Sequence, residues 1–147
     1  MIEKLIPEII RCGYRVATIK HGKEINLDPE KDSSRHLSAG STATALVAGN
    51  QLIAMKPHKK AVTLTDAVHF LGDDCDLIIC EGFKQYNAPK ILVRSRRIDR
   101  TPDNIIGVFA EVNDEPSPSK VPQFDPDDVT GLANIIIEAV LKSDRKG

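Results

Sequence analysis

An acidic residue, a glycine and a lysine follow a short apolar run near the middle of the chain. The run at residues 77–80 is typical of a strand buried inside a parallel sheet, and Glu81, Gly82 and Lys84 come directly after it. Ligands bind beyond the carboxyl ends of such strands. A carboxylate there can hold Mg²⁺ or its water, and a glycine lets the backbone approach a phosphate. An acidic surface turn is the alternative interpretation.

A second polar pair ends an earlier apolar run. Residues 14–20 are rich in β-branched side chains and predict a buried strand, which ends in Lys20 and His21. Lys20 could contact a phosphate as a point charge, and His21 could position an anion or a metal-bound water. Two solvated residues leaving a strand are the alternative.

A third candidate is the start of a short predicted helix over residues 32–39, which we expect Asp32 to cap. A helix start offers free N–H groups and a favourable dipole to anions, and Arg35 could add a bidentate phosphate contact. An ordinary capped, exposed helix explains the pattern equally well. A fourth candidate, the basic stretch Arg94, Arg96, Arg97 and Arg100, could bind an anionic cofactor or partner, or simply be solvated.

Cysteine usage is typical of the cytoplasm. The chain has three cysteines and no CxxC pair, so a disulfide framework is improbable. Cys80 ends the apolar run at residues 77–80, and we expect it to be a small buried core residue.

Length, charge and hydropathy exclude several classes of protein. The 147 residues predict a single domain, and the net charge of −1 argues against general nucleic-acid binding. No apolar run approaches the roughly 18–20 residues needed to cross a bilayer. We therefore expect a cytoplasmic protein that binds neither nucleic acid nor membrane.

Helical and strand patterns alternate along the chain and predict the elements that would position these residues. The strands beginning at residues 14 and 76 are followed by others at 89–94 and 105–110, and residues 44–48 and 52–55 predict a hairpin. Helical patterns cover 2–10, 32–39, 63–71 and a last segment capped by Asp125. Residues 113–126 are proline-rich and predict an extended surface connection. The fold class is α/β, layered, with a mostly parallel sheet and one β-hairpin.

These pieces, in this order, resemble the MobB family of molybdopterin-guanine dinucleotide biosynthesis adaptor proteins. The matching segments are Leu-Ile-Pro-Glu at 5–8, Gly-Tyr-Arg-Val-Ala-Thr-Ile-Lys-His at 13–21, Lys-Asp-Ser and Arg-His within 31–36, Ala-Gly at 39–40, Glu-Gly-Phe-Lys at 81–84, Pro-Lys-Ile at 89–91, and Phe-Asp and Asp-Asp-Val within 124–129. Their shared order, which covers about residues 1–142, is more specific than any one piece.

The resemblance implies a three-layer, P-loop NTPase-like fold and a homodimer that binds GTP with Mg²⁺ and is at most a weak GTPase. It also implies assistance to a molybdopterin guanylyltransferase, the partner that joins a guanine nucleotide to the molybdopterin cofactor. Carried over by position, Glu81 would lie near magnesium. The nucleotide or cofactor cleft would be lined by Lys20, His21, Asp32, Ser33, Arg35, Gly82 and Lys84. No residue is assigned a catalytic role.

The sequence departs from the family pattern in two places. Residues 22–26 read Gly-Lys-Glu-Ile-Asn where the family has further histidines, and no GxxxxGK[ST] motif occurs. In the family, the first strand and this Walker A loop precede the helix that Met1 begins. We therefore expect an N-terminally incomplete MobB-like domain over 1–147, without that strand and loop and with impaired nucleotide binding.

Two other interpretations stay open at this point. One is a natural short paralogue that binds molybdopterin or a partner protein without binding nucleotide. The other is a small α/β regulatory domain outside the family, which would want an aspartate phosphoacceptor at a strand end where Glu81 stands.

Overall fold

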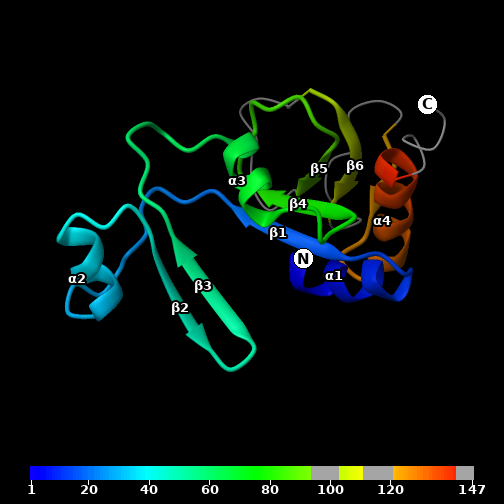
Figure 1. Cartoon of the computed structure of the whole chain (residues 1–147). Helices are drawn as coiled ribbons and strands as arrows, with labels where there is room; N and C mark the ends of the chain where they lie inside the picture. The colour runs from blue at the N-terminus through cyan, green and yellow to red at the C-terminus, as the bar shows by residue number, and fades with distance from the viewer. Residues whose placement is uncertain (94–102, 111–120, 142–147) are drawn as a thin grey trace. The chain divides into compact units, whose positions relative to one another are not determined.

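The computed structural model describes residues 1–93, 103–110 and 121–141, and the chain divides into two compact units (Figure 1). The first unit comprises Met1–His21 and Val68–Gly147, and the second comprises Gly22–Ala67. The basic stretch from Arg94 to Arg100 lies outside the described residues. Whether the two units form one domain stays a prediction.

The first unit alternates helices and strands as the sequence predicts. Its elements are α1 (Ile2–Arg11), β1 (Val16–Lys20), β4 (Leu77–Glu81), β5 (Lys90–Val93), β6 (Ile105–Phe109), β7 (Gln123–Phe124), α4 (Val129–Ile136) and the π-helical turn η1 (Ile137–Leu141). The helix α3 (Leu64–Leu71) crosses the boundary between the units. None of the helices in the described ranges is long and apolar enough to cross a membrane.

Parallel pairing dominates the first unit, which confirms the predicted fold class. β1 pairs with β4, and β5, β6 and β7 pair in that order, all parallel. The parallel strands therefore form two sheets rather than one. Packing joins them: strands of both sheets contribute side chains to one core.

That core lies between the helices α1 and α4 and the strands. Leu5 and Ile9 of α1 and Leu132 of α4 are fully buried, and they pack with Leu77 of β4 and Phe109 of β6. These apolar positions in α1 and α4 recur at helical spacing, so each helix presents one stripe to the strands. Burial of this stripe fixes both helices against the strands that carry the site.

Cys80 differs from expectation because it is exposed rather than buried. Burial along β4 falls from Leu77, which is buried, through the half-buried Ile78 and Ile79 to exposed Cys80 and Glu81. The apolar run indicates a buried strand, but its last residue lies at the exposed carboxyl end. The prediction of a buried Cys80 is therefore wrong.

Two predicted helix caps are also wrong, although the helices exist. Lys31 occupies the cap position of α2, and Asp32 is the first helical residue. At α4 the cap is Asp128, whose carboxylate accepts a 2.9 Å hydrogen bond from the N–H of Gly131, rather than Asp125. Several short acids precede α4, and any of them satisfies the pattern that a cap requires.

The described end of the proline-rich segment, residues 121–126, includes a short strand. Residues 113–120 of the segment lie outside the described ranges, but Gln123 and Phe124 form β7 beside β6 and are half-buried. The carbonyl of Pro122 accepts a 2.9 Å bond from the N–H of Val108. A proline at a sheet edge can supply this acceptor although it lacks a donor.

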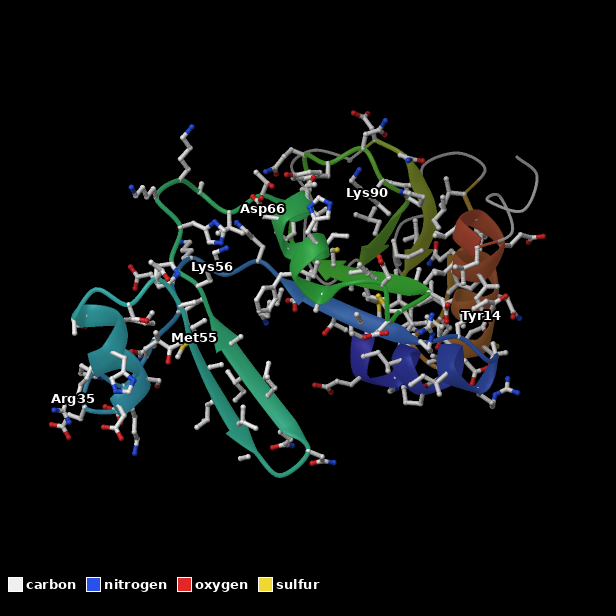
Figure 2. All side chains as sticks on the ribbon, in the orientation of Figure 1. Tyr14, Arg35, Met55, Lys56, Asp66 and Lys90 are labelled. Atoms are coloured by element: carbon white, nitrogen blue, oxygen red, sulfur yellow. The ribbon has the colours of Figure 1, made fainter. Side chains whose placement is uncertain are left out.

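The second unit contains α2 (Asp32–Ser38) and the antiparallel hairpin of β2 (Thr44–Ala48) and β3 (Gln51–Met55). Both were expected from the sequence. Thr63 and Asp66 form a capping box before α3: Thr63 N–H donates to Asp66 Oδ2 at 2.9 Å, and Asp66 N–H donates to Thr63 Oγ1 at 3.2 Å. Figure 2 shows Asp66 at the start of α3.

Candidate functional site

The structure brings two of the predicted polar groups together at the carboxyl ends of β1 and β4. Parallel register places Lys20 opposite Glu81, and their side chains form an ion pair of 3.2 Å between Nζ and Oε2. His21 N–H donates to the carbonyl of Glu81 at 2.9 Å, which extends the ladder past the strand. We call Lys20, His21, Glu81 and Gly82 the carboxyl edge.

Gly82 turns the chain at this edge with a backbone conformation that would be strained for any other residue. Its φ is +94°, and a Cβ built on it would lie 2.8 Å from the Cβ of His21. The space that glycine leaves is therefore taken by His21. Phe83 also has a positive φ, of 52°, which is rare outside glycine, asparagine and aspartate. Strained backbone of this kind is concentrated at functional sites.

Aromatic contacts hold the strained turn in place. The rings of His21 and Phe83 are 4.8 Å apart between centroids, and those of Phe83 and Tyr86 are 5.6 Å apart at nearly right angles. Tyr86 N–H also donates to the carbonyl of Phe83 at 3.0 Å. The imidazole of His21 is thereby packed against the turn at one face.

Lys90 also bonds to the loop that contains Tyr86, a role that the sequence did not suggest. Its ammonium donates to the carbonyls of Tyr86 at 2.5 Å, Ala88 at 3.2 Å and Asp103 at 3.3 Å (Figure 2). A lysine at the start of a predicted strand carries no signal for this contact, because its acceptors are backbone carbonyls, and one of them, that of Asp103, lies 13 residues away in the chain.

The charges at the carboxyl edge remain accessible to a ligand. The side chains of Lys20 and Glu81 are 75% and 56% exposed, and exposed ion pairs contribute only about 0–1 kcal/mol. A ligand with its own charges can therefore replace this pair at low cost. Lys84 lies two residues beyond Gly82 and is exposed, without an ion pair to any other described residue.

The protein oxygen atoms at the carboxyl edge are enough to bind magnesium only if a ligand with phosphate groups supplies further oxygens. Within the described ranges, no group of three or more His, Cys, Asp and Glu side chains could hold a metal ion. Mg²⁺ needs six oxygen ligands, but it commonly takes one or two from protein carboxylates and the rest from phosphates and water. Glu81, exposed at the strand end, can supply one such oxygen.

The remaining predicted residues lie on α2 in the second unit. Arg35 forms an i,i+3 ion pair of 3.6 Å with Asp32, and Ser33 is half-buried. Because Asp32 lies in the first turn, its carboxylate already faces the positive end of the helix dipole. The negative charge of Asp32 would repel an anionic ligand at this helix end. The nucleotide-binding role of Asp32, Ser33 and Arg35 stays a prediction.

Two sets of polar contacts, which we call clamps, hold together the strands and helices that carry the carboxyl edge. At the opposite end of β1 and β4, Arg15 donates to Asp76 from its backbone N–H at 2.8 Å, from Nε at 3.2 Å and from a guanidinium nitrogen at 2.9 Å. These bonds from Arg15 lower the pKa of Asp76 from its ordinary 3.8 to about 2. The two strands are thereby held in register.

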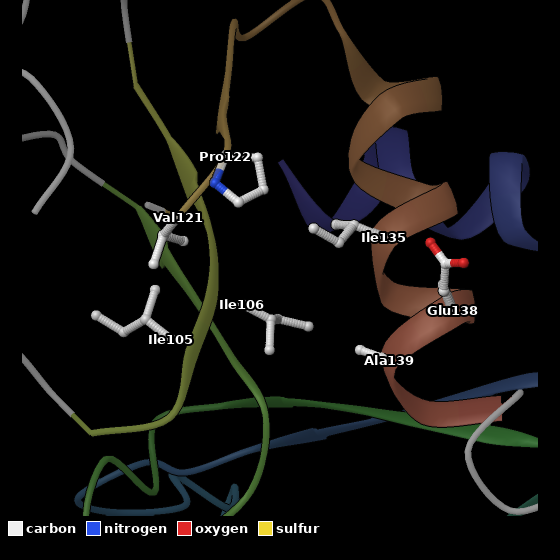
Figure 3. A pocket seen from close by; sticks show the side chains of 7 residues that line it. All are labelled: Ile105, Ile106, Val121, Pro122, Ile135, Glu138 and Ala139. Atoms are coloured by element: carbon white, nitrogen blue, oxygen red, sulfur yellow. The ribbon is translucent and has the colours of Figure 1, made fainter. Parts of the chain in front are cut away.

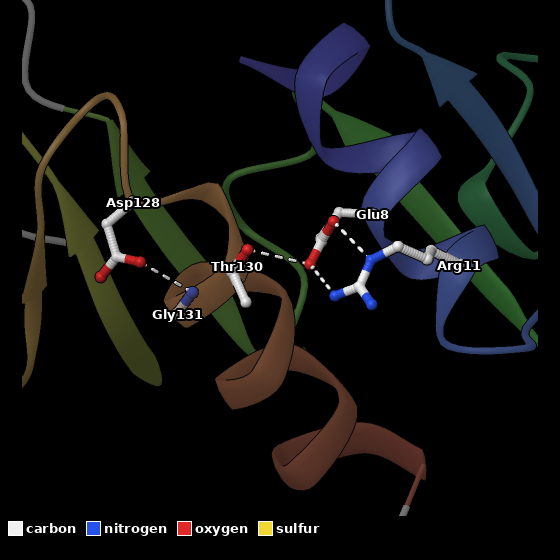
Figure 4. A network of polar contacts seen from close by, with 5 residues as sticks. All are labelled: Glu8, Arg11, Asp128, Thr130 and Gly131. Carbon is white, nitrogen blue, oxygen red and sulfur yellow. Dashed lines mark hydrogen bonds and ion pairs between the residues drawn. The ribbon is translucent and has the colours of Figure 1, made fainter.

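The second clamp joins α1 to α4 (Figure 4). Thr130 Oγ1 donates to Glu8 Oε1 at 2.9 Å, and the same carboxylate accepts from Arg11 at 2.6 Å. Hydrogen bonds from Arg11 and Thr130 lower the pKa of Glu8. This polar contact joins α1 to α4 in addition to the apolar residues that the two helices share in the core.

An apolar hollow of about 310 Å³ lies elsewhere in the first unit (Figure 3). It is lined by Ile105, Ile106, Val121, Pro122, Ile135, Glu138 and Ala139. None of the site residues predicted from the sequence is among them. The hollow begins at the amino end of β6, so it is separate from the carboxyl edge.

Comparison with known proteins identifies relatives for nearly the whole chain. The family model for molybdopterin guanine dinucleotide synthesis protein B, MobB, matches residues 1–111. A molybdopterin-guanine dinucleotide biosynthesis adapter protein of Escherichia coli is 30% identical over 97% of this chain and 86% of its own length. That of Haemophilus influenzae is 38% identical over 68% of this chain, but the match spans only 58% of its length.

Solved structures agree on the fold. The crystal structure of Bacillus subtilis MobB matches 95% of this chain and 88% of its own with a TM-score of 0.70 at 22% sequence identity. A MobB homologue from Bacillus stearothermophilus matches 96% of this chain with a TM-score of 0.65 at 24% identity. These likenesses establish the α/β fold that the parallel strands indicate.

The family match rules out the interpretation as a small regulatory domain outside the family. It extends through β1, α2, β4 and β6, so it includes the carboxyl edge and the second unit. The sequence identities of 30% and 38% to the relatives of Escherichia coli and Haemophilus influenzae support the same family as the fold does. The chain belongs to the MobB family, the molybdopterin guanine dinucleotide synthesis protein B family.

Proposed function

We propose that this chain acts in the cytoplasm as an adaptor in molybdenum cofactor biosynthesis. In that role it assists a molybdopterin guanylyltransferase in joining a guanine nucleotide to molybdopterin. The family match and the adapter proteins of Escherichia coli and Haemophilus influenzae support this proposal. The structural observation that carries it is the pairing of Lys20 and Glu81 at the carboxyl ends of adjacent parallel strands.

The carboxyl edge is suited to the phosphates of GTP. Lys20 supplies a positive point charge to a phosphate oxygen, and Glu81 supplies an oxygen to Mg²⁺. Binding exchanges one exposed ion pair for two, because each partner of the Lys20–Glu81 pair gains a ligand of opposite charge. His21, packed against Phe83, presents its imidazole beside them, and Lys84 adds a further positive charge to the turn.

Nucleotide binding by this chain is weak in our proposal. P-loop proteins grip phosphates with backbone N–H groups, a lysine and a hydroxyl residue, all within the GxxxxGK[ST] motif. The 147 residues contain no such motif, so a few exposed charges have to supply the affinity. Contacts of this kind correspond to dissociation constants on the order of a millimolar.

Any GTPase activity is correspondingly low, and we assign no catalytic residue. Hydrolysis needs a group that positions or deprotonates water while the phosphates are held in line. Glu81 is committed to the metal in this proposal, and His21 is held against the ring of Phe83. The proposed role is therefore delivery and assembly rather than turnover.

The protein acts as a homodimer in this proposal, and the hairpin supplies the apolar surface for it. The cross-strand pair Val47 and Leu52 is 68% and 67% exposed, and the pair Leu46 and Ile53 is 56% and 58% exposed. Successive residues of a strand point to opposite faces, so both faces of this hairpin are apolar. A second copy can bury this surface.

A binding measurement with the guanylyltransferase of the same organism tests the adaptor role. The partner is immobilised, and this chain is titrated over it by biolayer interferometry, with and without GTP and Mg²⁺. We expect saturable binding without nucleotide. No binding under either condition would contradict the adaptor role, whereas binding that requires GTP would contradict the proposed minor role of the nucleotide.

A second candidate is a module that binds molybdopterin or a partner protein and no nucleotide at all. The absence of a GxxxxGK[ST] motif among the 147 residues favours it. It differs from the first proposal in one respect, since it leaves Lys20 and Glu81 without a nucleotide to bind. Titration with GTP and Mg²⁺ distinguishes the two.

A further inference from the structure

The segment between the hairpin and α3, residues 56–63, is exposed at every position and carries Lys56, His58, Lys59 and Lys60. We call it the basic segment. It lies in the second unit and has no helix or strand of its own. Figure 2 shows Lys56 just beyond Met55, where β3 ends. The proposed nucleotide site at the carboxyl edge does not use it.

The charge of this region is one-sided although the chain as a whole is nearly neutral. Residues 56–63 contain three lysines and no aspartate or glutamate, and Arg35, the other Lys or Arg between 33 and 65, is paired with Asp32. The net charge of the whole chain is −1. The lysines form no ion pair with any residue that the structure describes. Their charge is therefore available to a partner.

The geometry of the segment suits a broad anionic surface rather than a small anion. A phosphate site is built from converging backbone N–H groups, commonly with residues in the left-handed region. No residue of 56–63 has a positive φ, and the hollow in the first unit is not lined by any of them. Three lysines on an open, extended segment instead present separated charges.

The composition of the second unit favours protein over nucleic acid or lipid. Residues 22–67 contain no phenylalanine, tyrosine or tryptophan, so neither base stacking nor an aromatic membrane anchor is provided. The lysines suit the polar rim of a protein interface, and Ala61 and Val62, exposed beside them, offer small apolar contacts. Pro57 restricts the backbone of the segment and lowers the entropy lost on docking.

We infer that the basic segment is an electrostatic docking site for an acidic surface of a partner protein. The inference rests on the proposed adaptor role, and within that role the partner is the guanylyltransferase. Lysines of this kind act mainly on the rate of association and on its salt dependence, because they steer the partner before contact.

The test uses biolayer interferometry of the whole chain on the immobilised guanylyltransferase at 50, 150 and 300 mM NaCl. We expect Lys59→Glu/Lys60→Glu to weaken binding by about tenfold or more at 150 mM, chiefly through slower association. Lys59→Arg/Lys60→Arg keeps the charge and should bind like the unchanged chain. Lys23→Glu is a matched control, since Lys23 is an exposed lysine of the same unit outside the basic segment.

Each outcome bears on the inference. Unchanged affinity of Lys59→Glu/Lys60→Glu, with the unchanged chain still binding, overturns the docking site and leaves the adaptor role intact. No binding by the unchanged chain contradicts the partner itself and the inference with it. If the substitutions alter only self-association by sedimentation, or only binding to vesicles with 30% phosphatidylserine, the occupant is a second copy or a lipid surface, and the inference is wrong.

Discussion

Gly82 is the residue on which the geometry of the carboxyl edge depends most. Its φ of +94° and the 2.8 Å distance from a built Cβ to His21 Cβ both exclude a side chain without rearrangement. From the sequence, this glycine is expected to let the backbone approach a phosphate. The structure shows an additional reason for it, since the turn cannot form beside His21 if a Cβ is present.

Gly82→Ala should therefore destabilise the first unit by about 2–3 kcal/mol, the sum of left-handed backbone strain and a steric clash. Chemical denaturation followed by circular dichroism measures this. Gly13→Ala is the matched control, because Gly13 has a φ of +91° in the same unit and nothing within 4 Å of a built Cβ. Equal losses for the two variants would show that His21 does not restrict position 82.

Asp76 makes the stability of the first unit sensitive to acid. Arg15 holds the pKa of this carboxyl at about 2 rather than 3.8, so the pair stabilises the fold above pH 4. This contribution is lost progressively as the pH falls from about 4 to 2, when Asp76 becomes protonated. We expect the thermal midpoint to fall over this range, and to fall less in Asp76→Asn.

Thermal unfolding of both proteins between pH 6 and pH 2 measures the effect. Asp73→Asn serves as control, because Asp73 is exposed and lies in the turn before β4. It should follow the unchanged chain at every pH. An acid response of Asp76→Asn identical to that of the unchanged chain would contradict the strand clamp.

Among the helices and strands, α1 shows how an apolar stripe determines which side of a helix packs against the core. Ile9 is completely buried and Ile10, the next residue, is 55% exposed. Ile9→Ala should cost about 2–5 kcal/mol because it leaves a cavity between α1 and α4. Ile10→Ala should cost less than about 1 kcal/mol. Urea denaturation compares the two, and similar losses would mean that α1 does not pack through the stripe described.

The hairpin makes the homodimer testable at the same scale. Leu52→Lys/Ile53→Lys places one charge on each apolar face of β3 and should convert a dimer into a monomer. Gln51→Lys adds a charge to the same exposed strand without removing an apolar side chain. Analytical ultracentrifugation reports the mass. A dimer that survives the double substitution would show that the copies meet elsewhere.

The helices and strands were more predictable from the sequence than the residues that cap them or the side chains that they bury. The capping box of Thr63 and Asp66 was recognisable because both residues of the pair lie within four positions. Asp128 was not, since Asp125 and Asp127 lie beside it and satisfy the same local rule. The exposure of Cys80 depends on the extent of the surrounding strands, which no local pattern contains.

The candidate site was predictable in part, because some of its residues follow a local sequence pattern. Lys20 and Glu81 each follow an apolar run, and parallel pairing of β1 with β4 brings them together. Lys90 was missed because it binds carbonyls from two separate segments. The basic stretch from Arg94 to Arg100 lies outside the described residues, so its role stays a prediction.

Across the whole molecule, the candidate binding surfaces are divided between the two units. The first holds the carboxyl edge, with Lys20 and Glu81 in contact, and the second holds the hairpin and the basic segment. A nucleotide, a second copy and a partner protein can thus each have a surface of their own. This arrangement suits an adaptor, which has to bind several components rather than transform one.

An NMR titration of the ¹⁵N-labelled chain with GTP in the presence of Mg²⁺ tests the central claim most directly. We expect the amide signals of Lys20, His21 and Gly82 to shift, with a dissociation constant on the order of a millimolar. Glu81→Gln should remove the dependence on Mg²⁺. Micromolar affinity, shifts elsewhere in the chain, or a Glu81→Gln variant that still requires Mg²⁺ would contradict the account.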